Sequence, residues 1–118
     1  PNLAASRLLL RPVHEALGGK LARIFAGGAF VPRATARRLH ELGIPVAIGY
    51  GLTEACAVVT VNDLQPFRDD TVGLPIEGTE VRIAAPDASG AGEVHVRGPQ
   101  VFAGYLDDPE LTAETLVG

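Results

Sequence analysis

The chain has 118 residues, of which 47% are hydrophobic and 20% are charged, and its formal net charge is −4. This composition is typical of a globular domain and excludes wholesale disorder, while 14 glycines and 9 prolines predict many turns. The acidic balance disfavours general nucleic-acid binding, which depends on a clustered basic surface. We therefore expect a turn-rich globular unit with no nucleic acid among its partners.

Cysteine usage and hydropathy indicate the compartment. Cys56 is the single cysteine, so neither an intrachain disulfide nor a thiolate metal cluster can form. The apolar run at residues 55–59 is far shorter than the ~20 residues that span a bilayer, and no basic-then-apolar leader opens the chain. We expect a cytoplasmic protein without a transmembrane segment, in which Cys56 is a small core residue. Peripheral contact with a membrane stays open.

The first elements in chain order alternate between helical and extended patterns. Apolar spacing predicts a helix over residues 10–17, which Pro12 kinks or splits and a glycine pair ends. Residues 21–25 predict a short strand, a second helix follows over 32–43, and residues 44–48 predict the next strand. Such a strand–helix–strand unit should have parallel strands joined by a right-handed crossover.

Parallel strands bring the loops at their carboxyl ends to one edge of a sheet, where the ligands of open α/β sheets bind. Here those loops are residues 27–29, Gly-Gly-Ala, and residues 49–54, Gly-Tyr-Gly-Leu-Thr-Glu. We expect the two glycine-rich loops to converge on one site.

The second half of the chain changes period. Residues 80–83 and 93–97 alternate polar and apolar side chains, which predicts an antiparallel pair of half-buried strands. Prolines and glycines interrupt residues 63–78, so the boundary between halves is expected there. The predicted fold class is α/β: part of a parallel-sheet α/β subdomain at residues 1–65, followed by the start of an antiparallel β-rich subdomain at 66–118.

A final helix is expected near the end of the chain. Asp107 or Asp108 can cap it, with Pro109 at its first position. Leu111 and Leu116 are expected to face inward.

Residues 50–54 hold the richest set of chemical groups. Gly51 lets backbone N–H groups approach phosphate oxygens, and Thr53 can donate a further hydrogen bond. Glu54 can bind Mg²⁺, and Tyr50 can stack on a base. By composition alone, a plain turn is the more common outcome, with Tyr50 in the core and Glu54 in solvent.

Four ordered motifs change that balance. Residues 48–55, Ile-Gly-Tyr-Gly-Leu-Thr-Glu-Ala, contain a Tyr-Gly-x-Thr-Glu signature, and the Gly-Gly-Ala loop at 27–29 precedes it. A Gly-x-Pro-x-x-Gly segment follows at 73–78, and Gly-Glu-x-x-x-x-Gly at 92–98 leads to Gly-Tyr at 104–105. In this order the motifs resemble those of the adenylate-forming, AMP-binding enzymes: acyl-CoA synthetases, luciferases and peptide-synthetase adenylation domains. The chain is most similar to the long-chain fatty acyl-CoA synthetases.

The resemblance implies a two-step ligase with ATP, Mg²⁺ and coenzyme A. ATP and a fatty acid or other carboxylate give an acyl-adenylate and pyrophosphate, and coenzyme A then attacks the activated carbonyl. It implies that Tyr50 packs against adenine, that Thr53 contacts the α-phosphate, and that Glu54 holds Mg²⁺; the last two are the implied catalytic residues. Further residues implied in binding nucleotide or acyl substrate are Gly27, Gly28, Ala29, Gly49, Gly51 and Leu52.

The chain also departs from the family pattern. The phosphate loop with its lysine, the Trp-x-x-Thr-Gly-Asp segment and the catalytic lysine of the family have no counterpart among these residues, and the single lysine, Lys20, matches no such motif. We therefore expect an internal piece of a longer enzyme, inactive alone, whose partners include the rest of the parent chain.

Two other functions stay open. Leu52 favours the fatty acyl branch, because by resemblance amino-acid-activating domains often have proline there. A ligase for another carboxylate, such as an aryl or amino acid, remains an alternative, since the acyl pocket depends largely on residues outside this chain. The missing phosphate loop also leaves room for a small, non-catalytic nucleotide-binding module.

Overall fold

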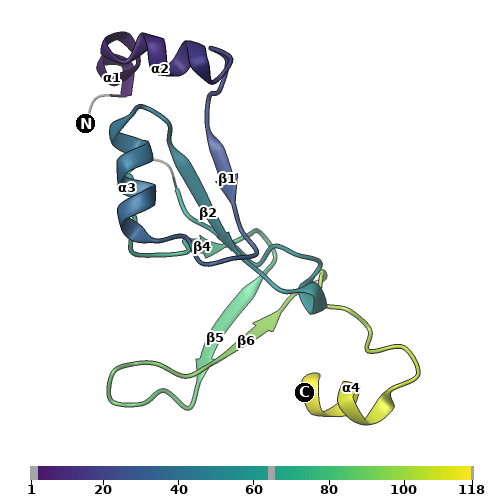
Figure 1. Ribbon diagram of the computed structural model, residues 1–118. Helices are drawn as coiled ribbons and strands as arrows, with labels where there is room; N and C mark the ends of the chain where they lie inside the picture. The colour runs from purple at the N-terminus through teal and green to yellow at the C-terminus, as the bar shows by residue number, and fades with distance from the viewer. Residues whose placement is uncertain (1–2, 64–65, 118) are drawn as a thin grey trace.

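The computed structural model describes residues 3–63 and 66–117. Its elements are, in order, α1 (Leu3–Leu9), α2 (Arg11–Ala16), β1 (Ile24–Ala26), α3 (Arg33–Glu41), β2 (Val46–Tyr50), the 3₁₀ helix η1 (Thr53–Ala55), β3 (Thr60–Val61), β4 (Leu74–Pro75), β5 (Glu80–Ala84), β6 (Glu93–Arg97) and α4 (Pro109–Thr115). Figure 1 shows α3 alongside β1 and β2, with the β5–β6 hairpin and α4 extending away from them. Within the described ranges, no helix combines the length and hydropathy needed to cross a bilayer.

The predicted mixed α/β fold is confirmed. β1 and β2 are parallel and joined through α3, with Ile24 opposite Val46, whereas β5 and β6 are antiparallel. Two strands that the sequence did not predict complete the first sheet, whose order is β1-β2-β3-β4. β4 joins this sheet from beyond residue 65, while the division into subdomains at residue 65 stays a prediction.

The core lies between α3 and β2. Ala36 of α3 is fully buried against Val46 and Ile48 of β2. Four residues beyond Ala36, on the same helical face, His40 is also buried, and its ring stacks on Phe67 with centroids 3.9 Å apart. The face of α3 that carries Ala36 and Leu39 therefore packs on β2, the strand that follows it.

Asn62, the residue after β3, continues the hydrogen bonding between β3 and β2. Its backbone N–H donates to the carbonyl of Ile48 at 2.9 Å, and its side-chain Oδ1 accepts from the Ile48 N–H at 2.6 Å. The side-chain amide also donates to the carbonyl of Arg68 at 3.0 Å. A buried asparagine thus satisfies both backbone groups of Ile48, as a strand residue would.

The first strand begins later than the sequence pattern suggested. The guanidinium of Arg7 donates to the carbonyls of Leu21 and Ala22 at 3.2 and 2.7 Å, so these residues bond to α1 and the ladder starts at Ile24. Pro12 was expected to kink or split a helix over residues 10–17, but it instead occupies the first turn of α2, where no backbone N–H is required.

The prediction that Cys56 is a core residue is wrong. Cys56 is exposed, and its φ of 49°, with 78° at Ala57, makes a left-handed turn after η1. The neighbouring Ala55 and Val59 are buried instead. An apolar run gave no sign of this turn, because neither residue is a typical turn former.

The final helix is confirmed, but not its buried face. Asp108 caps α4, since its Oδ1 accepts from the N–H of Leu111 at 3.0 Å, and Pro109 lies in the first turn. The expectation that Leu111 faces inward is wrong, because it is 42% exposed. Within the described chain, α4 has no buried residue.

Candidate functional site

Two glycines meet where the parallel strands end. A Cβ on Gly27 would lie 3.2 Å from the carbonyl oxygen of Gly49, and a Cβ on Gly49 would lie 2.8 Å from Cζ of Phe25. A side chain at Gly27 would press on the backbone of β2, and one at Gly49 would displace the ring of Phe25. The structure therefore brings Gly27, which follows β1, against the last residues of β2.

The segment 49–54 is part strand and part turn. Gly49 and Tyr50, expected in a loop, are instead the last residues of β2, opposite Val61 and Thr60 of β3. The carbonyl of Tyr50 accepts from the N–H of Val59 at 2.8 Å. Tyr50 is half-buried, so its ring is neither enclosed in the core nor fully exposed.

A tight turn follows at Gly51. A Cβ there would overlap the carbonyl of Ala57, so only glycine fits this close approach of backbone to backbone. The carbonyl of Leu52 then accepts from the N–H groups of Ala55 and Ala57, both at 3.1 Å. This turn fixes the start of η1 at the end of β2.

The short η1 helix presents two of the predicted site residues. Thr53 is exposed, and Glu54 is half-buried. On the neighbouring loop, Gly28 and Ala29 are exposed, and Gly28 adopts a φ of 76° with open space where a Cβ would be. Gly28, Ala29 and Thr53 are thus open to solvent, on the segments that follow β1 and β2.

Glu54 is held by a segment that lies far along the chain. The hydroxyl of Tyr105 donates to Oε1 of Glu54 at 2.6 Å, and the N–H of Phe102 donates to the Glu54 carbonyl at 2.8 Å. The hydrogen bond from Tyr105 lowers the pKa of Glu54, and the same bond raises the pKa of Tyr105. Glu54 is therefore an anion with a fixed hydrogen-bond partner.

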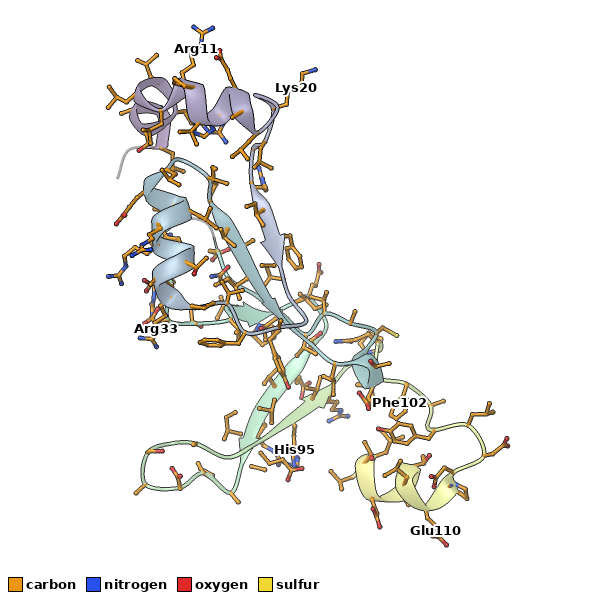
Figure 2. All side chains as sticks on the ribbon, in the orientation of Figure 1. Arg11, Lys20, Arg33, His95, Phe102 and Glu110 are labelled. Atoms are coloured by element: carbon orange, nitrogen blue, oxygen red, sulfur yellow. The ribbon has the colours of Figure 1, made fainter. Side chains whose placement is uncertain are left out.

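Tyr105 was not among the predicted site residues. The signal that could have singled it out is the Gly-Tyr pair at the end of the fourth motif, but the pattern gave no sign of contact with Glu54. The ring of Tyr105 meets that of Phe102 edge to face, with centroids 4.8 Å apart. Figure 2 shows Phe102 on the segment between β6 and α4.

The Glu54 carboxylate fits the role of one protein ligand to a cation whose other ligands are nucleotide phosphates and water. Among the described residues, no group of three or more His, Cys, Asp or Glu side chains could hold a metal ion. Mg²⁺ usually binds proteins through one or two carboxylates and takes its other ligands from substrate phosphates and water. A carboxylate offers about four acceptor positions, and Tyr105 takes one of them.

Two cavities of about 350 and 240 Å³ lie elsewhere. The larger is basic and is formed by α1, α2 and the residues after them, near Arg11 and Lys20 in Figure 2. Neither is lined by a predicted site residue. The candidate site therefore rests on the sheet edge rather than on these cavities.

Similarity to known proteins covers most of the chain. It is 35% identical over 101 residues to the 2-succinylbenzoate–CoA ligase of Lactococcus lactis subsp. lactis (strain IL1403), an alignment with 84% of this chain and 22% of that protein. It is 34% identical over 113 residues to the long-chain-fatty-acid–CoA ligase ACSBG2 of Gallus gallus, with 95% of this chain and 15% of that protein. The o-succinylbenzoate coenzyme A synthetase (MenE) of Bacillus subtilis, solved in complex with AMP, shares the fold with a TM-score of 0.70 at 22% identity, over 94% of this chain and 25% of that one.

The chain thus spans roughly a fifth of the length of these curated relatives, between 15% and 22%. The motif resemblance is confirmed by a family match that extends through all four motifs. Residues 3–106 match the family described as AMP-binding enzyme, and the chain belongs to this family of adenylate-forming ligases.

Proposed function

We propose that this chain forms part of the adenylation site of a ligase that activates a carboxylate with ATP and transfers the acyl group to coenzyme A. The observation that best supports this is the meeting of Gly27 and Gly49 at the ends of two parallel strands, beside the helix that carries Thr53 and Glu54. This edge is where open α/β sheets bind nucleotides. The curated relatives named above are CoA ligases.

In the proposed reaction, a carboxylate oxygen attacks the α-phosphorus of ATP and pyrophosphate leaves. Tyr50 packs against the adenine, Thr53 donates a hydrogen bond to the α-phosphate, and Glu54 holds Mg²⁺. The cation, when bound, neutralises phosphate charge as the pyrophosphate departs. The remaining residues proposed to border nucleotide or acyl substrate are Gly27, Gly28, Ala29, Gly49, Gly51 and Leu52.

A fatty acid is the proposed carboxylate, and the cytoplasm the proposed location. Leu52 in the Gly-Leu-Thr-Glu segment and the similarity to long-chain-fatty-acid–CoA ligases support the substrate. An aryl carboxylate is the second candidate, supported by similarity to a 2-succinylbenzoate–CoA ligase and to the fold of o-succinylbenzoate coenzyme A synthetase.

Exchange of labelled pyrophosphate into ATP tests both proposals. The whole enzyme containing this chain should exchange with a long-chain fatty acid and not with 2-succinylbenzoate, whereas the reverse preference would favour the second candidate. The 118-residue chain alone should give no exchange, because the family's phosphate loop and catalytic lysine have no counterpart in it.

Substitution of Glu54 tests the site itself. Glu54→Gln should lower exchange by about 100-fold or more, the usual loss when one preorganised electrostatic contact is removed. Glu114→Gln is the matched control, because Glu114 is an exposed carboxylate on α4. Equal exchange by the two variants at limiting Mg²⁺ would contradict the proposed role of Glu54.

A further inference from the structure

Glu54 is held at two points by one short segment. The hydroxyl of Tyr105 donates to its carboxylate at 2.6 Å, and the N–H of Phe102 donates to its carbonyl at 2.8 Å. Both the side chain and the main chain of Glu54 are therefore tied to residues 102–105, which lie about 50 positions further along the chain.

Tyr105 is itself held in place by contacts other than its bond to Glu54. Its N–H donates to Oγ1 of Thr112 at 2.9 Å, and the Thr112 hydroxyl donates to the carbonyl of Asp108 at 2.7 Å. The ring packs edge to face on Phe102. The start of α4 and an aromatic contact thus orient the phenol, which in turn holds the carboxylate.

Besides Tyr105, the backbone N–H of Glu54 itself acts on the carboxylate and lowers its pKa. The side chain extends from a 3₁₀ helix of three residues that a left-handed residue, Cys56, ends at once. A glutamate on so short a helix can adopt several rotamers, and the hydrogen bond from Tyr105 selects among them. Its orientation is therefore set by its own backbone together with a hydroxyl from outside its element.

We infer that Tyr105 is a positioning residue for the Glu54 carboxylate, which it holds ready for the cation that accompanies the nucleotide. This inference rests on the proposed function, in which Glu54 is the cation ligand. Carboxylates that bind metals are themselves usually hydrogen-bonded, and loss of such an outer partner typically weakens metal affinity 10- to 100-fold. A merely structural Tyr105 would only anchor residues 102–117 to η1.

The test removes the hydroxyl and keeps the ring. In the whole enzyme, Tyr105→Phe should raise the Mg²⁺ concentration for half-maximal pyrophosphate exchange about 10-fold. It should weaken binding of Mn²⁺ to the enzyme with a non-hydrolysable ATP analogue, measured by electron paramagnetic resonance, by a similar factor. The Tm should stay unchanged, because the phenyl ring still packs on Phe102.

Gln100→Leu is the matched control. It removes the side-chain hydrogen bond from Gln100 to Oγ1 of Thr79, which also spans two distant segments but does not involve Glu54. Its Mn²⁺ affinity should equal that of the unsubstituted enzyme. In a Glu54→Gln background, Tyr105→Phe should cause no further loss of Mn²⁺ affinity, because the group it positions is already gone.

The outcomes separate the inference from the proposed function. If Glu54→Gln weakens Mn²⁺ binding and Tyr105→Phe does not, the positioning role is overturned and the proposed function stands. If neither variant weakens it, the cation role of Glu54 fails as well. If Tyr105→Phe lowers the Tm, Thr112→Val provides a second measurement, because it keeps the Tyr105 hydroxyl and removes only the group that accepts from the Tyr105 N–H. Weakened Mn²⁺ binding without loss of Tm supports the positioning role. Unchanged Mn²⁺ binding overturns it.

Discussion

The α3–β2 unit and the β5–β6 hairpin are both regular, yet only the first has a core. Val46 and Ile48 of β2 are buried under Ala36 of α3, whereas none of the residues in β5 and β6 is buried. Ile83 and Val94, one of the two apolar pairs of the hairpin, are 42% and 41% exposed. A complete hydrogen-bonded ladder therefore does not by itself supply burial, and an isolated two-stranded hairpin is marginally stable at best.

The overall dimensions express the same contrast. The radius of gyration is 18.1 Å, whereas a compact domain of this length would have one of about 13 Å. Figure 1 shows the hairpin and α4 standing apart from the first sheet. We expect packing to dominate the stability of the α3–β2 unit, and turn geometry to dominate that of the hairpin.

The largest difference should come from matched isoleucine substitutions. Ile44, which is 1% exposed, precedes β2, and Ile83 lies in the hairpin. Ile44→Ala should lower the free energy of unfolding of the chain by about 2 to 5 kcal/mol, because it leaves a cavity in a packed core. Ile83→Ala should cost less than about 1 kcal/mol, because its side chain is already partly exposed to water. Urea unfolding measures the free energy of unfolding of both variants. Equal losses would contradict the stated difference between the packed core and the hairpin.

Two glycines with similar φ angles give a second test of the comparison between the first sheet and the β5–β6 hairpin. Gly73 and Gly90 have φ values of 90° and 84°, so alanine is strained at either position by about 1 to 2 kcal/mol. At Gly73 a Cβ would also overlap the backbone of Val61, whereas nothing lies within 4 Å at Gly90. Gly73→Ala should therefore destabilise the chain more than Gly90→Ala and expose the amides of β3 and β4 to hydrogen exchange. Equal effects would show that the first sheet yields as easily as the hairpin.

The pH dependence of the core is a smaller effect. Burial lowers the pKa of His40 from its ordinary value of 6.5, so the folded chain holds this imidazole neutral. Its contribution to stability is fully present above pH 6.5 and is lost as the pH falls from there through the lower folded-state pKa. His40→Phe, which keeps a ring against Phe67, should flatten the fall in Tm between pH 7 and 5. A variant with the same slope as the unsubstituted chain would contradict this assignment. The charged side chains around His40 are those of Arg37, Glu41 and Asp69.

The smallest effect is expected at the tip of the hairpin. Oδ1 of Asp87 accepts from the N–H and hydroxyl of Ser89 at 2.7 and 2.6 Å and from the N–H of Ala91 at 3.1 Å. The bonds from Ser89 lower the pKa of Asp87 from 3.8, so their stabilising effect is present above that pH and disappears as the pH falls through the folded-state pKa. Asp87→Ala should speed amide exchange at Ala91 without changing exchange in β2. Slower or unchanged exchange at Ala91 would show that the hydrogen bonds of Asp87 do not stabilise the hairpin.

The regular elements could be predicted wherever a periodic pattern was long enough. The nine residues of α3 repeat apolar positions over two turns, β5 alternates over four residues, and β6 alternates over five. β3 and β4 could not be predicted, because two residues cannot establish a period and their pairing depends on partners elsewhere in the chain. The late start of β1 could not be predicted either. It follows from the bonds of Arg7 to the carbonyls of Leu21 and Ala22, which join positions that no local sequence pattern relates.

The candidate site shows a similar limit. The motif at residues 50–54 singled out Thr53 and Glu54, and the parallel strands predicted that Gly27 would approach the end of β2. The bond from Tyr105 to Glu54 joins residues 51 positions apart, so neither helical nor strand periodicity relates them. The roles proposed for the site residues stay predictions that the exchange experiments address.

The position of β1 has a consequence for handling this chain by itself. β1 is the end strand of its sheet, has only three residues, Ile-Phe-Ala, and its Phe25 is 58% exposed. Natural edge strands are usually blunted by charge, proline or a covering element, because their open N–H and C=O groups template pairing with another chain. With no charged side chain in β1 to oppose this, two copies can extend one sheet into the other, so preparations of the 118-residue chain should gain stability against self-association when Phe25 is replaced by lysine.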